Sequence, residues 1–97
     1  MVGVLNGVRA AFECGLCICN NERMGVRAVC GGARLTNIPS FGEHLDKKLI
    51  VLGLARNFIR KITAKDLQKF PNLRVMDLRD QNGCVNVERD VPYDVEI

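Results

Sequence analysis

The chain has 97 residues, enough for one small domain, and its composition of 47% hydrophobic and 26% charged residues is that of an ordinary globular protein. It contains no apolar run of the roughly 18 to 20 residues that a membrane-spanning helix needs. Residues 1–83 carry a net charge of +6 and residues 84–97 one of −3, but the basic residues are scattered, and one Tyr with no Trp offers no platform for stacking bases. The composition therefore argues against a membrane span in this chain and against nucleic acid as a partner.

The first ten residues, M-V-G-V-L-N-G-V-R-A, look like the end of a secretory signal, because Val8 and Ala10 suit the small-residue cleavage site before Ala11. Their apolar part is short and no basic residue precedes it, so a disordered N-terminus is the alternative. We expect residues 1–10 to be the remnant of a secretory signal and residues 11–97 to form a single domain.

Four cysteines fall within 17 residues in the pattern C-x2-C-x-C-x10-C: Cys14, Cys17, Cys19 and Cys30. In a short chain this pattern indicates either two disulfides or a tetrahedral metal site. Zinc sites usually pair two C-x2-C knuckles across a longer spacer, whereas three of these cysteines crowd at one end. Disulfides are therefore favoured, and a zinc-binding module is the alternative.

The stretch 49–78 repeats its apolar residues at a fixed distance. Leu49, Leu52 and Leu54 recur 24 positions later, at positions 73, 76 and 78. A period of about 20 to 29 residues with the pattern L-x-x-L-x-L-x-x-N is typical of a leucine-rich repeat. The alternating leucines put one face of a short strand inward. Asn57 stands where the chain leaves the strand, and its side chain there can hydrogen-bond the backbone of the bend.

The cysteine pattern is followed by L-x-x-I-P and leads into the leucine pattern, and together they resemble the cysteine-rich N-terminal cap of extracellular leucine-rich-repeat proteins. The resemblance spans residues 14 to about 81. It implies disulfides between Cys14 and Cys19 and between Cys17 and Cys30, and it implies an extracellular location, either secreted or as the ectodomain of a cell-surface protein.

The resemblance also implies the fold class. We expect an α/β leucine-rich-repeat solenoid, short, with parallel strands on its concave side, irregular or short helical returns, and a disulfide-bonded N-terminal cap. The cap would span residues 14–40, the repeats residues 49–83, and an acidic C-terminal extension residues 84–97. Val85, Val87, Val91, Tyr93, Val95 and Ile97 alternate with polar residues in the extension. It either covers the last coil as a strand-like segment or becomes ordered only on a partner.

Little in the sequence points to catalysis. Ser40, His44 and Asp46 are close in sequence, but no oxyanion turn accompanies them, and a serine and a histidine without an oriented acid are not a triad. No phosphate-binding motif is present. We therefore expect no enzyme, no cofactor and no resident metal.

Protein binding is the function that the pattern favours. The residues between the inward leucines would face the concave side of the strands, namely Arg27, Val51, Gly53, Arg56, Arg74, Val75, Asp77 and Arg79. Taken singly, each of them is better explained as part of a solvated surface. The expected partner is another protein, with a homodimer as one form. The alternative is a structural or assembly protein whose open C-terminal end stacks on another chain or crosslinks to it through the fifth cysteine, Cys84, unless that thiol is buried and inert.

Overall fold

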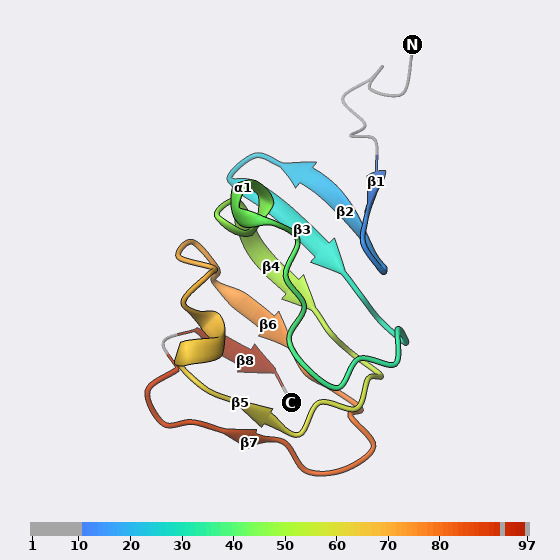
Figure 1. Cartoon of the computed structure of the whole chain (residues 1–97), viewed down its shortest axis with the longest axis vertical. Coiled ribbons are helices and arrows are strands. Elements are labelled where there is room, and N and C mark those ends of the chain that lie inside the picture. The colour runs from blue at the N-terminus through green and yellow to red at the C-terminus, as the bar shows by residue number, and fades with distance from the viewer. Residues whose placement is uncertain (1–10, 92, 97) are drawn as a thin grey trace.

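The computed structural model describes residues 11–91 and 93–96. Its strands are β1 (Ala11–Cys14), β2 (Cys17–Glu22), β3 (Gly25–Val29), β4 (Leu49–Gly53), β5 (Lys61–Ile62), β6 (Val75–Asp77), β7 (Asn86–Val87) and β8 (Asp94–Glu96), and its helical segments are α1 (Glu43–Asp46) and the 3-10 turn η2 (Lys65–Leu67). Within this described part, six strands form one sheet in the order β1-β2-β3-β4-β6-β8, and β5 and β7 form a second (Figure 1). The expected signal remnant, residues 1–10, lies outside the described residues.

The large sheet changes from antiparallel to parallel pairing at β3. β1, β2 and β3 are antiparallel neighbours, whereas β3, β4, β6 and β8 run parallel. Arg27 of β3 pairs with Val51 of β4, which pairs with Val75 of β6, so partners lie 24 positions apart along the chain. The spacing of the leucines in the sequence is therefore the pairing register of these three strands.

The predicted fold class, an α/β leucine-rich-repeat solenoid, is wrong. The antiparallel strands β1 and β2 belong to the same sheet as the parallel strands, so the domain is a small mixed-sheet domain. The 24-residue register also ends at β6, because Val75 pairs on its other side with Asp94, only 19 positions away. Among the described residues, helix is limited to four residues in α1 and three in η2.

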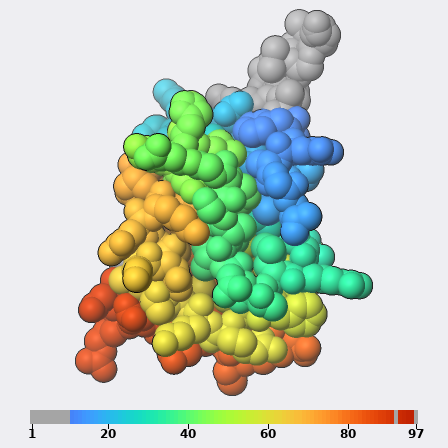
Figure 2. Space-filling model, viewed as in Figure 1, coloured from blue at the N-terminus to red at the C-terminus, as the bar shows by residue number. Residues whose placement is uncertain are grey.

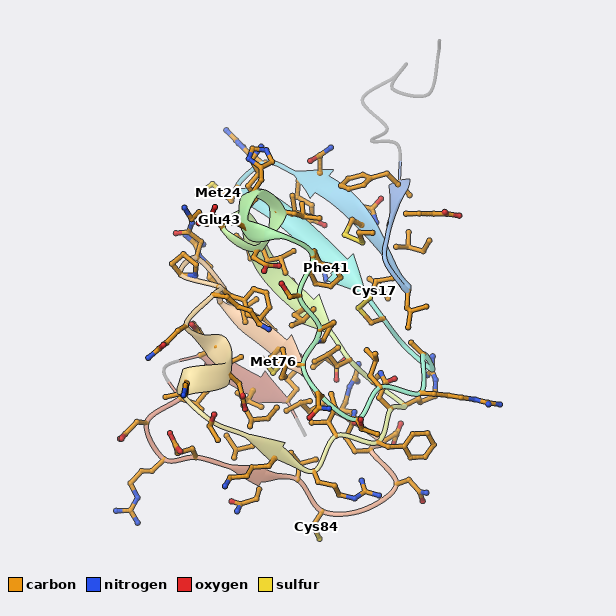
Figure 3. All side chains as sticks on the ribbon, viewed as in Figure 1. Cys17, Met24, Phe41, Glu43, Met76 and Cys84 are labelled. Atoms are coloured by element: carbon orange, nitrogen blue, oxygen red, sulfur yellow. A yellow bond between two sulfur atoms is a disulfide. The ribbon has the colours of Figure 1, made fainter. Side chains whose placement is uncertain are left out.

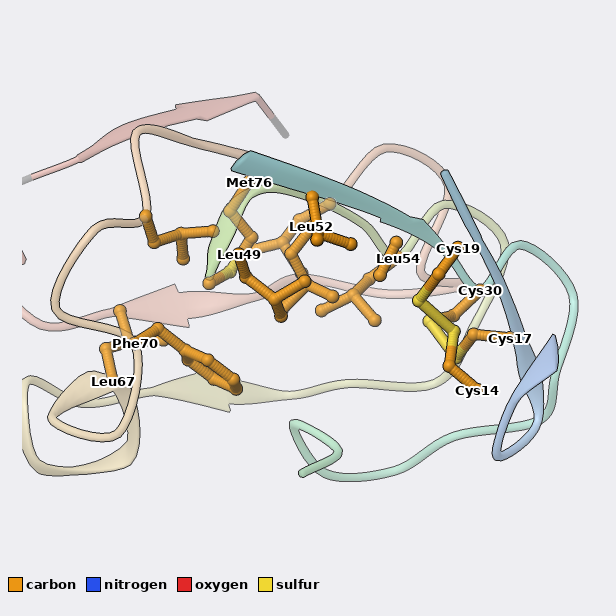
Figure 4. Packing of buried hydrophobic residues seen from close by; sticks show 14 of the residues in the cluster. Cys14, Cys17, Cys19, Cys30, Leu49, Leu52, Leu54, Leu67, Phe70 and Met76 are labelled. Carbon is orange, nitrogen blue, oxygen red and sulfur yellow. A yellow bond between two sulfur atoms is a disulfide. The ribbon is translucent and has the colours of Figure 1, made fainter. Parts of the chain in front are cut away.

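One face of the large sheet is buried and forms the core. Side chains alternate between the two faces along a strand, so Ala28, Leu52 and Met76, which are partners in register, all point inward and are 0% exposed. Side chains from the connecting segments and from β5 fill the space beside them, and the bridged cysteines close one end (Figure 4). The other buried apolar residues are Val26, Leu49, Leu54, Ile59, Ile62, Leu67, Phe70, Leu73 and Leu78.

A buried amide side chain joins two neighbouring bends of the chain. Asn57 is 1% exposed, and its Oδ1 accepts hydrogen bonds from the backbone N–H groups of Ala33 (3.0 Å) and Leu35 (2.9 Å). Its Nδ2 donates to the carbonyl oxygens of Cys30 and Leu54, both at 2.9 Å. The prediction that Asn57 hydrogen-bonds the backbone of its bend is confirmed, and the same side chain also holds the preceding bend.

Gln81 repeats this arrangement 24 positions later. Its Oε1 accepts from the N–H of Ile59 at 2.9 Å, and its Nε2 donates to the carbonyl oxygen of Leu54 at 2.6 Å. The carbonyl oxygen of Leu54 therefore accepts one hydrogen bond from Asn57, in its own bend, and one from Gln81, in the next bend. An unpaired buried polar group lowers the stability of the folded state by about 1 to 3 kcal/mol. By pairing such groups, the side chains of Asn57 and Gln81 avoid this loss at each of the bends they join.

The C-terminal extension covers the end of the core, which is one of the two alternatives left open by the sequence. β7 pairs in parallel with β5, and β8 pairs in parallel with β6. The hydroxyl of Tyr93 donates to the carbonyl oxygen of Phe70 at 3.1 Å, and burial raises the pKa of this hydroxyl. The acidic side chains of the extension, Glu88, Asp90, Asp94 and Glu96, remain exposed.

The segments that precede β4 and β6 lie against each other on the side of the molecule seen in Figure 2, the first in green and the second in yellow and orange. The side-chain Nδ2 of Asn72 donates to the carbonyl oxygen of Lys47 at 2.6 Å across this contact. In the second segment, Thr63 and Asp66 exchange side-chain-to-backbone hydrogen bonds of 3.1 Å, an arrangement like a capping box at the start of the turn η2.

Replacing the buried amide tests how much the bends depend on it. Asn57→Ala removes bonds to two N–H groups and three carbonyls, so we expect the free energy of unfolding to fall by about 2 to 4 kcal/mol. Denaturant titration followed by circular dichroism measures this change. Asn86→Ala, at an exposed position of β7, is the matched control and should change stability by less than about 0.5 kcal/mol. Equal losses in the two variants would contradict the role given to Asn57.

Candidate functional site

The four N-terminal cysteines form two disulfides, Cys14–Cys19 and Cys17–Cys30, which is the pairing that the resemblance implies. Their Cα–Cα distances are 6.0 and 4.4 Å, within the usual range for a disulfide. Zinc is bound by thiolates, and a sulfur held in a disulfide is not a thiolate. These cysteines therefore staple the hairpin of β1 and β2 to the core, and the described residues contain no group of three or more histidine, cysteine or acidic side chains placed to hold a metal ion.

Ser40 and Asp46 meet, but they do so as part of the loop before β4. The hydroxyl of Ser40 donates to Oδ2 of Asp46 at 2.6 Å, and the N–H of Phe41 donates to Oδ1 at 2.7 Å. Each oxygen of the buried Asp46 carboxylate thus accepts a hydrogen bond from the loop, one from a side chain and one from the backbone. His44, in contrast, is exposed on α1. A histidine base between serine and acid, as a hydrolytic triad requires, is not formed by these described residues.

The face of the large sheet opposite the core is open, and we call it the outer face. One row of paired residues across it runs Arg27, Val51, Val75 and Asp94, and the adjacent row runs Ile18, Val29, Gly53, Asp77 and Glu96. A groove of about 370 Å³ crosses both rows toward the carboxyl ends of the parallel strands. The groove is the concave feature that the outer face offers to another molecule.

The structure brings together seven of the eight residues that the sequence places on the docking surface. The groove is lined by Arg27, Val51, Gly53, Arg56, Val75, Asp77 and Arg79, together with Val29, Gly31, Ala55 and Glu96. Arg74 is exposed but is not among the lining residues. Val29 was missed although it lies 24 positions before Gly53, so the register would have identified it. Glu96 was missed because the position of β8 does not follow the leucine spacing.

Exposed apolar side chains continue the groove over β2 and β3. Ile18 and Val29 are paired in register, and each is 46% exposed. Leu16, at the turn between β1 and β2, is 74% exposed, whereas Phe12 of β1, which is 36% exposed, pairs with the buried Cys19 and so lies on the core side of the sheet. Large exposed apolar groups that lie together indicate an interaction surface more often than isolated ones do. The leucine spacing does not predict this part of the surface, because the hairpin of β1 and β2 lies outside the leucine repeat.

Two of the three arginines in the groove are already paired. Nε of Arg27 lies 2.8 Å from Oε2 of Glu22. Arg79 holds the carboxylate of Asp77 with two side-chain hydrogen bonds, of 2.9 and 2.7 Å, and a backbone one of 3.0 Å. These bonds from Arg79 lower the pKa of Asp77, against an opposing effect of burial, and the positive charge of Arg56 lowers it further.

Arg56 differs from its neighbours, because no ion pair is found for its side chain among the described residues. Its guanidinium lies close to Gly31, where a Cβ atom would come within 3.4 Å of Nη2. Arg56 therefore presents in the groove a guanidinium without an ion-pair partner of its own among the described residues, although its charge is felt by Asp77.

Cys84 is exposed and outside both disulfides. It projects from the loop between β6 and β7, at the end of the molecule remote from the cysteine-stapled hairpin (Figure 3). A buried thiol, one of the alternatives left open by the sequence, is therefore excluded.

The pair of Asp77 and Arg79 predicts a pH dependence of stability. The folded-state pKa of Asp77 is lowered, so its contribution is present above the unfolded value of about 4 and is lost as the pH falls through the folded value. Asp77→Asn should therefore be less stable than wild type at about pH 7, and the difference should shrink at a pH well below about 4, the unfolded value. Denaturant titrations at both pH values measure this difference. Because Arg79 is 61% exposed, added salt should reduce it; parallel pH profiles would contradict the prediction.

Among the described residues, no helix has the length and apolar character needed to cross a membrane. Comparison of the chain with protein-family models, with curated proteins and with solved structures found no match in any of the three. The groove and the exposed apolar residues beside it are therefore the basis on which a function can be argued.

Proposed function

We propose that this protein is an extracellular protein-binding module that docks a partner protein on the outer face of its six-stranded sheet. The observation that carries the proposal is the groove, whose floor is made of small and branched apolar residues and whose rim is charged. Protein interfaces commonly combine an apolar centre with a polar rim. The two disulfides support an oxidising, extracellular setting, because such bonds are rare in the cytosol.

Gly53 supports docking because the fold itself does not require a glycine at that position. A Cβ atom at Gly53 would meet its nearest neighbours, the carbonyl oxygen of Ala28 and the Cα of Val29, at ordinary distances of 3.6 and 3.8 Å. Gly25 shows the contrast, because a Cβ there would come within 2.5 Å of the carbonyl oxygen of Lys48. Glycine weakens a strand interior and often marks the close approach of a ligand or another backbone. Gly53 keeps the centre of the groove open.

Filling the groove tests the proposed function. A photo-reactive residue at position 75 should crosslink a partner from the extracellular fluid, and the same residue at position 65, in η2, should not.

We expect the purified partner to bind Gly53→Val at least about tenfold more weakly than wild type, because the added side chain occupies the floor of the groove. Calorimetric titration measures the affinity, and the melting temperature of the variant should be unchanged or higher.

Lys61→Val is the matched control, because it places the same side chain on β5, at an exposed position outside the groove. It should bind the partner with wild-type affinity. If Gly53→Val binds as well as wild type, or if both variants lose binding equally, the outer face is not the docking surface.

A second candidate function is an assembly role in which Cys84 crosslinks two chains. Its exposure on the loop between β6 and β7 favours this role. Under oxidising, non-reducing conditions we expect the wild-type protein to show a dimer mass that reduction converts to the monomer. Cys84→Ser should remain monomeric and keep both N-terminal disulfides. A wild-type protein that stays monomeric with a free thiol under these conditions would contradict the assembly role.

A further inference from the structure

The backbone of Arg56 has a conformation that suits glycine better than arginine. Its φ angle is 58°, in the left-handed region, where a Cβ atom is crowded. The equivalent positions of the neighbouring bends, Gly32 (φ 68°) and Asp80 (φ 60°), share this conformation and lie 24 residues before and after it. Gly32 and Arg56 make corresponding backbone hydrogen bonds of 3.0 Å, to the carbonyl oxygens of Ala55 and Arg79. The bend therefore requires a left-handed residue, and glycine would fill the position at least cost.

The fold gains little from the arginine side chain. Within residues 11–91 and 93–96, no hydrogen bond or ion pair is found for the guanidinium of Arg56, whereas those of Arg27 and Arg79 are paired with Glu22 and Asp77. A residue held in an unfavourable backbone conformation without a structural return is a reason to look for a function. The side chain of Arg56 lines the groove beside the apolar floor of Val51 and Val75.

We infer that the groove takes an extended segment of the partner protein that carries a carboxylate side chain, and that Arg56 pairs with this carboxylate. This inference rests on the proposed function and specifies the chemistry of the partner. A guanidinium offers donors in a fork that matches both oxygens of a carboxylate. On either side of the pair, small apolar side chains of the segment contact Val29, Val51 and Val75, and Gly53 gives the segment's backbone room to approach.

The charge of the groove supports a carboxylate over other partners. Asp77 is already neutralised by Arg79, so Arg56 is the cation that remains available in the described part of the groove. Glu96 lies at the far side of the groove, on β8, and gives the opposite rim a negative charge. Arg56 therefore attracts the acidic residue of a bound segment, and Glu96 repels it. The two charges together fix the direction in which the segment lies in the groove.

Three pools of short extended peptides test the inference. In each pool the central residue is fixed, as Glu, Gln or Lys, and valine occupies alternate flanking positions. We expect the Glu pool to shift the NMR signals of the Val29, Val51 and Val75 amides and of the Arg56 Nε–H group, and to bind about fivefold more tightly than the Gln pool. Added salt should reduce this preference, because the pair is at the surface. Equal binding of the three pools would overturn the inference.

Arg34 provides a matched control. It is also an exposed arginine with a positive φ, 59°, and it does not line the groove. Arg56→Gly and Arg34→Gly should both melt at or above the wild-type temperature, because glycine relieves the left-handed conformation in each. Only Arg56→Gly should lose the preference for the Glu pool.

The outcomes separate the inference from the proposed function. If Arg56→Gly binds the Glu pool like wild type while Gly53→Val does not, the groove binds a partner but the carboxylate assignment is overturned. If Gly53→Val also binds the Glu pool like wild type, the peptides bind elsewhere, and both the inference and the proposed docking surface fail.

Discussion

The arrangement of the chain depends on the hydrogen bonds that the buried side chain of Asn57 makes with the backbone of two bends. Successive bends expose N–H and C=O groups to a dry interior, and such groups are unfavourable there unless they are paired. Asn57 pairs those of its own bend and of the bend before it, and Gln81 does the same one pass later. These two amides fix the distance between bends, and this distance places β3, β4 and β6 side by side in register. The floor of the outer groove is a consequence of that register.

The two faces of the large sheet follow different rules. The inner face is a closed apolar layer sealed by two disulfides at one end and by β7, β8 and Tyr93 at the other. The outer face keeps features that a stability argument alone would not select: exposed Ile18 and Val29, a glycine at the end of β4, and an arginine in a left-handed bend. Because the cost of these features falls on one surface, that surface is where we place the function. The opposite side, with its capped turn and buried Asp46, is explained by the needs of the fold.

The electrostatic character of the groove depends on which of its charged side chains are already in ion pairs. Arg79 and Asp77 neutralise each other at the surface, and Arg27 is neutralised by Glu22 on the neighbouring strand. A guanidinium that is already bonded gains less from a new partner than one that is free. Arg56 is therefore the position at which an incoming carboxylate gains the most. The sheet supplies the rigid, nearly pre-formed surface that makes such a contact specific.

The sequence by itself determined the register of β3, β4 and β6, the role of Asn57 and most of the residues that line the groove, because local periodicity fixes which side chains share a face. It did not determine the fold class. Whether β1 and β2 would pair antiparallel within the same sheet, and whether residues 84–97 would join β5 and β6, depends on contacts between segments distant in sequence, for which periodicity gives no signal. The tertiary structure also decided which arginine is free, since ion pairing depends on distances between strands. It likewise decided that Glu96 belongs to the groove, because β8 reaches its place by closing the core rather than by repeating the leucine spacing.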